Sequence, residues 1–195
     1  MNPIETQRLF LAIAVPETVR AELQRLQLKL QPFLPPRAAR WIKPEQLHLT
    51  LKFLGNVPVA DTDALSAAVR AVCAGAPRMR LRAEGVGFFP NARSPRVFWV
   101  DIKSMDGRLD DFQRQLELAA QPFAAKEDAK PFAAHVTLAR FEKLREEQMN
   151  RLTAALAKRE IFGEWTGEEV QLIKSSLQSS GALHAILDAF RTKNG

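Results

Sequence analysis

The hydrophobic and polar positions of this chain follow two kinds of pattern. Apolar residues at every second position, or in a short continuous run, predict a strand, whereas apolar residues three or four positions apart predict an amphipathic helix. Strands are expected over residues 8–15, 47–54, 79–89, 97–102, 134–140, 169–177 and 183–190, and a turn over 178–181 joins the last two. Helices are expected over residues 17–30, from 61 or 62 to about 74, from about 105 to 120 and from about 144 to 158.

The order of these elements favours an α+β fold. Single helices and hairpin-like successions separate the strands, which suits two largely antiparallel sheets with flanking helices better than a doubly wound parallel sheet. The segments around His48 and His135 also repeat the pattern His-x-Thr in an apolar frame, 87 residues apart. Two copies at this distance do not make a solenoid. We therefore expect a duplicated unit, with two similar lobes in one domain over residues 1–195.

The composition limits the class of protein. With 195 residues, of which 46% are hydrophobic and 26% charged, the chain can form one compact domain or two small lobes. The longest uninterrupted apolar run, from Leu9 to Val15, is far shorter than the roughly 20 residues that a membrane-spanning helix needs. It also lacks the basic flank and the small-residue cleavage pattern of a secretory signal. We therefore expect a cytoplasmic protein that makes no contact with a membrane.

The charge balance favours anionic partners. The chain has 28 basic and 22 acidic residues, a net charge of +6 and a pI near 9.8. These values suit phosphate-bearing ligands, although a solvated surface explains the excess of basic residues equally well. Cys73 has no second cysteine to pair with, and the three histidines are scattered without the spacing of metal ligands. We expect no metal and no cofactor.

The repeated motif places polar side chains on one face of each strand. Side chains alternate between the two faces, so His48, Thr50 and Lys52 are expected on one face, and His135 and Thr137 on the matching face of the second copy. A pseudo-twofold axis between the lobes would make the two pairs face one another. A single His-x-Thr is usually only a polar strand face, but two copies in matching frames favour a function. Two imidazoles beside two hydroxyls suit acid and base catalysis at a phosphorus centre.

At this point the sequence resembles a known family. The two motifs, the opening Arg8–Ala12 and the segments 41–55 and 131–140 resemble the two-histidine phosphoesterases. The resemblance is greatest to the RNA 2′,3′-cyclic phosphodiesterases, which are also called 2′-5′ RNA ligases, and it covers nearly the whole chain.

The resemblance implies a bilobal fold with a central cleft and a metal-independent reaction in RNA processing. In this reaction the 2′,3′-cyclic phosphate at an RNA end opens to a 2′-phosphomonoester, and the reverse reaction joins RNA ends such as tRNA halves through a 2′-5′ bond. By the motif, His135 is the general base that activates water, and His48 is the acid that protonates the departing 3′ oxygen. By the same resemblance, Thr50 and Thr137 are expected to hold the phosphate. A monomer is expected, because no spare apolar helix remains.

Further residues are candidates for binding the substrate. Arg140 occupies the position of a phosphate-contacting arginine, but its offset of five from His135 turns it away from the imidazole unless the strand ends, twists or bulges near Ala139. Lys52 has the right parity for a contact, or it only attracts anions at long range. Trp41 either stacks on a terminal base or is buried. Phe53 is expected in the core, and His184 replaces an aromatic residue of the family with no assigned role.

Two alternatives to an RNA-end phosphodiesterase remain open. The same histidines would serve an enzyme for small nucleotide cyclic phosphates or for 2′-5′ oligoadenylate. A noncatalytic RNA-binding module would use the basic cleft and the aromatic residues without depending on both imidazoles, so loss of either histidine would leave its binding largely intact.

Overall fold

The computed structural model describes residues 4–125, 131–156, 160–178 and 181–193. In these ranges nine strands form one sheet in the order β7-β4-β5-β6-β3-β1-β8-β9, and β2 pairs with β6. The strands are β1 (Thr6–Ala14), β2 (Ala39–Trp41), β3 (His48–Pro58), β4 (Met79–Phe89), β5 (Val97–Ser104), β6 (His135–Phe141), β7 (Ile161–Gly167), β8 (Glu169–Gln178) and β9 (Gly181–Arg191). The helices are α1 (Glu17–Leu30), α2 (Thr62–Gly75), α3 (Leu109–Ala120) and α4 (Glu146–Ala154).

The fold confirms the expected α+β class and most of the expected elements. Helix α3 begins four residues later than expected, because Gly107 adopts a positive φ of 70° and the hydroxyl of Ser104 accepts the N–H of Leu109. The expected end of the fourth helix at Lys158 lies outside the described residues, and so does the tip of the turn over 178–181. The short strands β2 and β7 were not expected. No helix in the described ranges is long and apolar enough to span a membrane.

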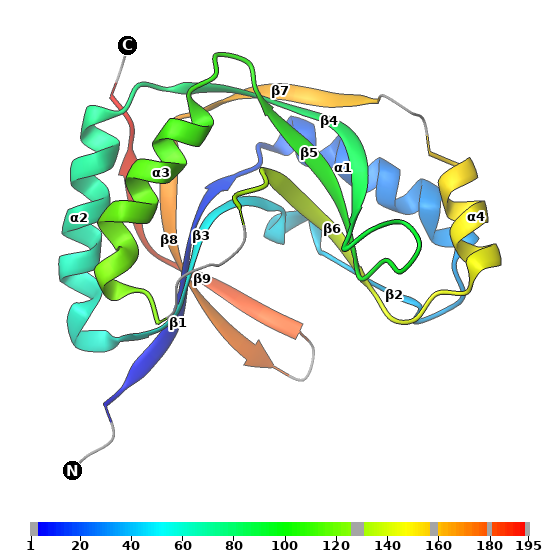
Figure 1. Cartoon of the computed structure of the whole chain (residues 1–195), viewed down its shortest axis with the longest axis horizontal. Helices are drawn as coiled ribbons and strands as arrows, with labels where there is room; N and C mark the ends of the chain where they lie inside the picture. The colour runs from blue at the N-terminus through cyan, green and yellow to red at the C-terminus, as the bar shows by residue number, and fades with distance from the viewer. Residues whose placement is uncertain (1–3, 126–130, 157–159, 179–180, 194–195) are drawn as a thin grey trace.

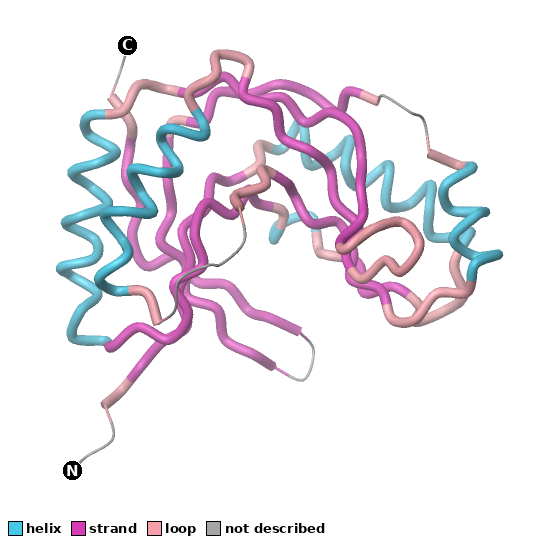
Figure 2. The backbone as a smooth tube through the Cα atoms, in the orientation of Figure 1, coloured by secondary structure: helices cyan, strands magenta, loops and turns pink. Residues whose placement is uncertain are grey.

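The sheet is continuous, whereas two sheets were expected. Its two halves, β3-β1-β8-β9 and β7-β4-β5-β6, are joined by a single residue pair, Leu49 of β3 and Val136 of β6. Both residues are fully buried in one hydrophobic core that extends through both halves. The sheet therefore curls around this junction, as Figure 2 shows.

Two helices pack on one half of the sheet, and a third links the two halves. Helix α2 contacts α3 and β9, and α3 contacts β3, so both helices pack on the half that contains β3 (Figure 1). Helix α1 follows β1 but packs against β7 of the other half. The opposite side of β1 carries Phe10 and Ala12, which form a separate small cluster with Ile173 of β8. We call this side of the sheet, which also carries the histidines described next, the open face.

Candidate active site

The two His-x-Thr motifs meet at the junction of the sheet halves. If the antiparallel register of Leu49 and Val136 is continued by one residue in each direction, His48 comes opposite Thr137, and Thr50 comes opposite His135. The four side chains are half-buried, while the residues between them are buried in the core. All four therefore lie on the open face, related by a local twofold axis.

Each imidazole is oriented by a backbone carbonyl two residues before it. The Nδ1 of His48 donates to the carbonyl of Gln46 at 2.7 Å, and the Nδ1 of His135 donates to the carbonyl of Ala133 at 2.6 Å. Because a carbonyl oxygen only accepts, these bonds place the Nδ1 proton in both rings. The Nε2 atoms are left for chemistry, as a base when the ring is neutral and as an acid when it is charged.

Aromatic rings surround His48. The centroid of its ring lies 4.9 Å from that of Phe10 and 5.5 Å from that of His184. Burial lowers the pKa of His48 to about 4, although the hydrogen bond to the Gln46 carbonyl raises it. Positive charge on His184 or His135 would lower this pKa further. The imidazole of His48 is therefore neutral in the free protein. A cavity of about 150 Å³ beside it is lined by polar and apolar side chains, among them Gln171, Ile173, His184 and Ile186.

The surroundings of His135 are similar in shape and different in charge. Its ring lies 5.0 Å from that of Phe89 and 6.1 Å from that of Trp99. A Cβ atom at Gly87 would come within 2.2 Å of the Trp99 ring, so only glycine allows this packing. Burial lowers the pKa of His135, the Ala133 carbonyl opposes the shift, Arg140 lowers the pKa further, and Asp101, which is opposite His135 on β5, raises it.

Both histidine strands contain a β-bulge three residues after the histidine. On β3, Thr50 and Lys52 pair with consecutive residues of β1, so Leu51 is an extra residue. On β6, Thr137 and Ala139 pair with consecutive residues of β5, so Leu138 is extra. A bulge shifts the alternation of side chains by one. Residues beyond it therefore lie on the face opposite to the one that a straight strand predicts.

The bulge on β6 brings Arg140 to the open face. Its side chain is exposed, whereas Leu138 and Ala139 are buried in the core. Its guanidinium lowers the pKa of His135, which places the two groups within electrostatic range of one another. Arg140 therefore reaches the face of His135 despite its odd offset, because the strand bulges near Ala139.

The bulge on β3 exchanges the expected roles of two neighbouring residues. Lys52 is 3% exposed and pairs with Glu117 of α3, so the expectation that it shares the face of His48 is wrong. Phe53 is 49% exposed, and its ring lies 6.0 Å from that of Phe10 on the open face, so its expected core position is also wrong. The sequence contained one signal for the position of Phe53. It follows His48 by the same five residues as Arg140 follows His135, so a bulge that exposes Arg140 would also expose Phe53 in the repeated unit.

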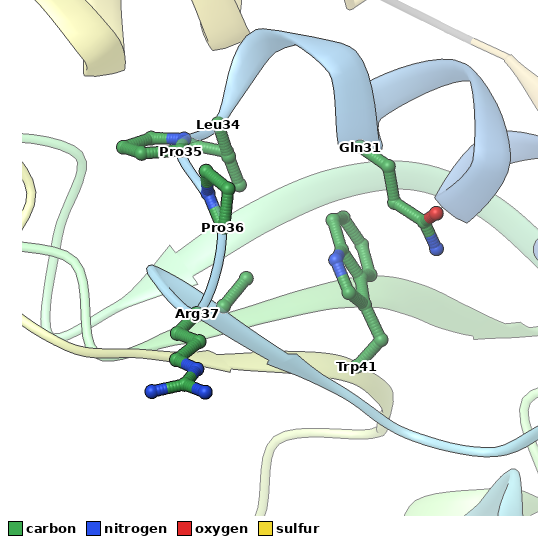
Figure 3. A pocket seen from close by; sticks show the side chains of 7 residues that line it. Gln31, Leu34, Pro35, Pro36, Arg37 and Trp41 are labelled. Atoms are coloured by element: carbon green, nitrogen blue, oxygen red, sulfur yellow. The ribbon is translucent and has the colours of Figure 1, made fainter.

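Trp41 lies on the helix-covered face of the sheet. It pairs with the buried Ala139, and its ring is edge-on to Phe98 in the core at 6.5 Å. Figure 3 shows its indole beside Gln31 in a cavity of about 340 Å³ that Leu34 and Arg37 also line. The structure does not bring Trp41 to the histidines.

His184 is a third imidazole at the site. It lies on β9 opposite Ser175, and its ring is 5.1 Å from that of Phe10 and 5.5 Å from that of His48. Burial lowers its pKa. The sequence could not reveal this proximity, because it depends on the register between strands that are distant in the chain. In the described ranges, His, Cys, Asp and Glu side chains form no group of three or more that could hold a metal ion.

Comparison with known proteins identifies the family. The family model described as LigT-like phosphoesterase matches the chain twice, over residues 13–99 and 100–184, so that each match contains one His-x-Thr motif. The RNA 2′,3′-cyclic phosphodiesterase of Thermus thermophilus is 36% identical over 191 residues, which cover 94% of this chain and 89% of the relative. The protein of the same name from Methanothermobacter thermautotrophicus is 28% identical and covers 94% of this chain and 98% of the relative.

Solved structures show the same fold. A protein of Thermus thermophilus superposes with a TM-score of 0.80 at 30% identity, covering 96% of this chain and 98% of that one. Escherichia coli LigT complexed with 3′-AMP superposes with a TM-score of 0.77 at 26% identity, covering 96% of this chain and 99% of LigT. Together with the two family matches, these similarities show that the chain belongs to the two-histidine, LigT-like phosphoesterase family.

Proposed function

We propose that this protein hydrolyses the 2′,3′-cyclic phosphate at RNA ends to a 2′-phosphomonoester. The observation that carries the proposal is the twofold arrangement of two imidazoles, each with its Nδ1 bound to a carbonyl and its Nε2 free, at one junction of the open face. The names of relatives such as the Thermus thermophilus RNA 2′,3′-cyclic phosphodiesterase support this activity.

In the proposed reaction, His135 and His48 act on opposite sides of the phosphorus atom. The Nε2 of neutral His135 accepts a proton from water while the water oxygen forms a bond to phosphorus. The bond from phosphorus to the 3′ oxygen breaks, and this oxygen takes a proton from the Nε2 of charged His48. Both histidines then return to their starting states by exchanging protons with solvent. The step is a displacement at phosphorus that needs no redox partner.

The charges near the two histidines support these roles. Arg140 stays charged at all working pH values and lowers the pKa of His135 more than Asp101 raises it, so it favours the neutral, basic form. The groups whose charge would lower the pKa of His48 are the imidazoles of His184 and His135, and burial lowers the pKa of both, which disfavours that charge. A phosphate anion between the histidines can therefore promote protonation of His48, as the acid role requires.

The remaining residues of the open face bind the substrate in this proposal. Hydroxyl groups of Thr50 and Thr137 donate to the nonbridging oxygens, and Arg140 offsets their charge. Phe53 provides an exposed ring on which a terminal base can stack. Lys52 and Trp41 are left out, because one is buried against Glu117 and the other lies on the covered face.

The same displacement joins two RNA ends when a ribose hydroxyl replaces water. An RNA end with a free 5′ hydroxyl, such as that of a tRNA half, would then attack the cyclic phosphate and form a 2′-5′ bond. We also infer a single bilobal domain that acts as a cytoplasmic monomer. The two consecutive family matches and the common core of both sheet halves support the single domain.

The test is product analysis with a short RNA that ends in a 2′,3′-cyclic phosphate, in the presence of a chelator. The native protein should release only the 2′-phosphate, and His48→Ala and His135→Ala should each lose about 10²-fold to 10⁴-fold in rate while remaining folded by circular dichroism. Trp41→Phe is the control that should keep its rate. Turnover retained in a histidine variant, or lost on chelation and restored by metal, would contradict the mechanism.

The same assay separates the alternatives. A cyclic mononucleotide or 2′-5′ oligoadenylate cleaved much faster than the RNA would point to a small-molecule phosphodiesterase. Binding of RNA by all variants without turnover in any of them would point to an RNA-binding module.

A further inference from the structure

Three arginines lie on the open face, which also carries the proposed catalytic pair. Arg40 of β2 is directly opposite Arg140 of β6 in the antiparallel register. Arg8 lies on β1, two residues before Phe10, and therefore on the same side of the sheet. All three side chains are exposed. The cluster thus takes one arginine from the sheet half of β1 and two from the other half.

This cluster lacks negative charge of its own. Like charges directly opposite one another on adjacent strands destabilise a sheet. In the described ranges no ion pair with a carboxylate involves any of the three arginines. Partial burial of its guanidinium and the charges of Arg40 and Arg8 lower the pKa of Arg140, so both arginines lie within electrostatic range of it. An anion bound among them would relieve this repulsion.

Arg140 connects the cluster with the reacting centre. Its charge lowers the pKa of His135, and the charges of Arg40 and Arg8 lower its own pKa. An anion held by Arg8 and Arg40 is therefore a neighbour of the phosphate between the histidines and a different group from it. In a nucleotide whose 2′ and 3′ oxygens carry the reacting phosphate, the next anionic group is the phosphate on the 5′ oxygen of the same ribose.

We propose that Arg8 and Arg40, with Arg140, form a subsite for the internucleotide phosphate on the 5′ side of the terminal nucleotide. The planar guanidinium group suits this role, because its paired donors match two phosphate oxygens. The subsite selects RNA ends over cyclic mononucleosides. This inference rests on the proposed function, because it uses the histidines to place the terminal phosphate.

The test compares the binding of three uncleavable product ligands by calorimetry at one fixed salt concentration. They are a nucleoside 2′-phosphate, the same nucleoside with an added 5′-phosphate, and a dinucleotide that ends in the same 2′-phosphate. The native protein should bind both larger ligands at least about tenfold more tightly than the first, which corresponds to about 1.4 kcal/mol. In Arg40→Gln and Arg8→Gln this gain should fall to about threefold or less.

Arg114→Gln is the matched control. Arg114 is exposed on α3, where it pairs with Asp111, and the substitution removes the same charge from the helix-covered side. It should keep the full gain. Thermal unfolding should show Arg40→Gln to be at least as stable as the native protein, because the substitution removes repulsion with Arg140.

Each outcome decides a separate point. No gain from the 5′ substituent in the native protein, or an equal loss in Arg114→Gln, overturns the subsite. A gain with the 5′-monophosphate but not with the dinucleotide overturns the internucleotide assignment and identifies a site for nucleotide monophosphates. Hydrolysis of the cyclic phosphate without any gain in affinity refutes this inference and leaves the proposed function standing. A gain in affinity without hydrolysis supports the subsite and refutes the proposed function.

Discussion

Substrate binding is expected to cause protonation of His48. Burial lowers the pKa of this imidazole to about 4, so at pH 7 about one molecule in a thousand carries the charged form in the free protein. The proposed acid needs that proton. A cyclic phosphate is a monoanion over the whole working range of pH, so the proton must come from solvent when the substrate binds.

The required shift has a magnitude that one phosphate can supply. Raising the pKa of His48 from about 4 to about 7 requires three units, or about 4 kcal/mol of preferential interaction with the charged form. A unit negative charge about 4 Å from the imidazolium contributes about 4 kcal/mol at an effective dielectric constant of 20. The anion between the histidines is therefore sufficient on its own.

Calorimetry in buffers with different ionisation enthalpies measures this proton directly. We suggest His135→Ala as the binding protein, because it lacks the proposed base and leaves the cyclic phosphate intact. Between about pH 5 and pH 6.5, binding should take up nearly one proton, and affinity should fall about tenfold for each unit that the pH rises. Above the pKa of the complex the affinity should become independent of pH.

Two further variants assign the proton to its residue. Adding His48→Ala to His135→Ala should abolish the uptake, whereas adding His184→Phe should preserve it, because His184 contacts His48 without receiving the acid role. Binding without proton uptake in this pH range, or uptake that follows His184, would refute the assignment of His48 as the acid.

Two more predictions test residues that the bulge on β3 relocates. Glu117→Gln removes the carboxylate from the buried ammonium of Lys52 and should lower the free energy of unfolding by about 3 kcal/mol in urea titrations. Lys52→Met should lower the free energy of unfolding far less and should leave the rate of hydrolysis unchanged. Phe53→Ala should raise KM about tenfold to a hundredfold with little loss of stability, because it removes an exposed stacking surface. Phe33→Ala, at an exposed position of the short helix that follows α1, should leave KM unchanged, and an equal effect of both would refute the role of Phe53.

The shared face of each histidine and its threonine could be predicted from the sequence, because each motif lies within a regular stretch of strand. From His48 to Thr50 and from His135 to Thr137 no residue is inserted, so alternation alone places the hydroxyl on the face of the imidazole. The buried residue between them, Leu49 or Val136, confirms the phase. Local pattern is sufficient there.

Prediction failed where the hydrogen-bonding register changes. Nothing in the residue types at Leu51 or Leu138 signals an extra residue, because a buried leucine fits a regular strand equally well. Only the partner strand shows the shift. The same limit applies to His184 and Trp41, whose faces depend on which strands lie beside them rather than on their own neighbours in the chain.

The proposed mechanism requires one motif to serve as acid and the other as base, although a local twofold axis relates them. The axis makes the two imidazoles equivalent in orientation, so the difference must come from residues that the duplication does not share. Ala14 is opposite His48 where Asp101 is opposite His135, and Phe53 occupies the position on β3 that Arg140 occupies on β6. Beyond its bulge, β3 thus presents an aromatic ring, whereas β6 presents a cation. A nucleotide bound across the junction can place its base toward the first and its phosphates toward the second, which fixes the direction in which the substrate lies and hence which histidine faces the departing 3′ oxygen.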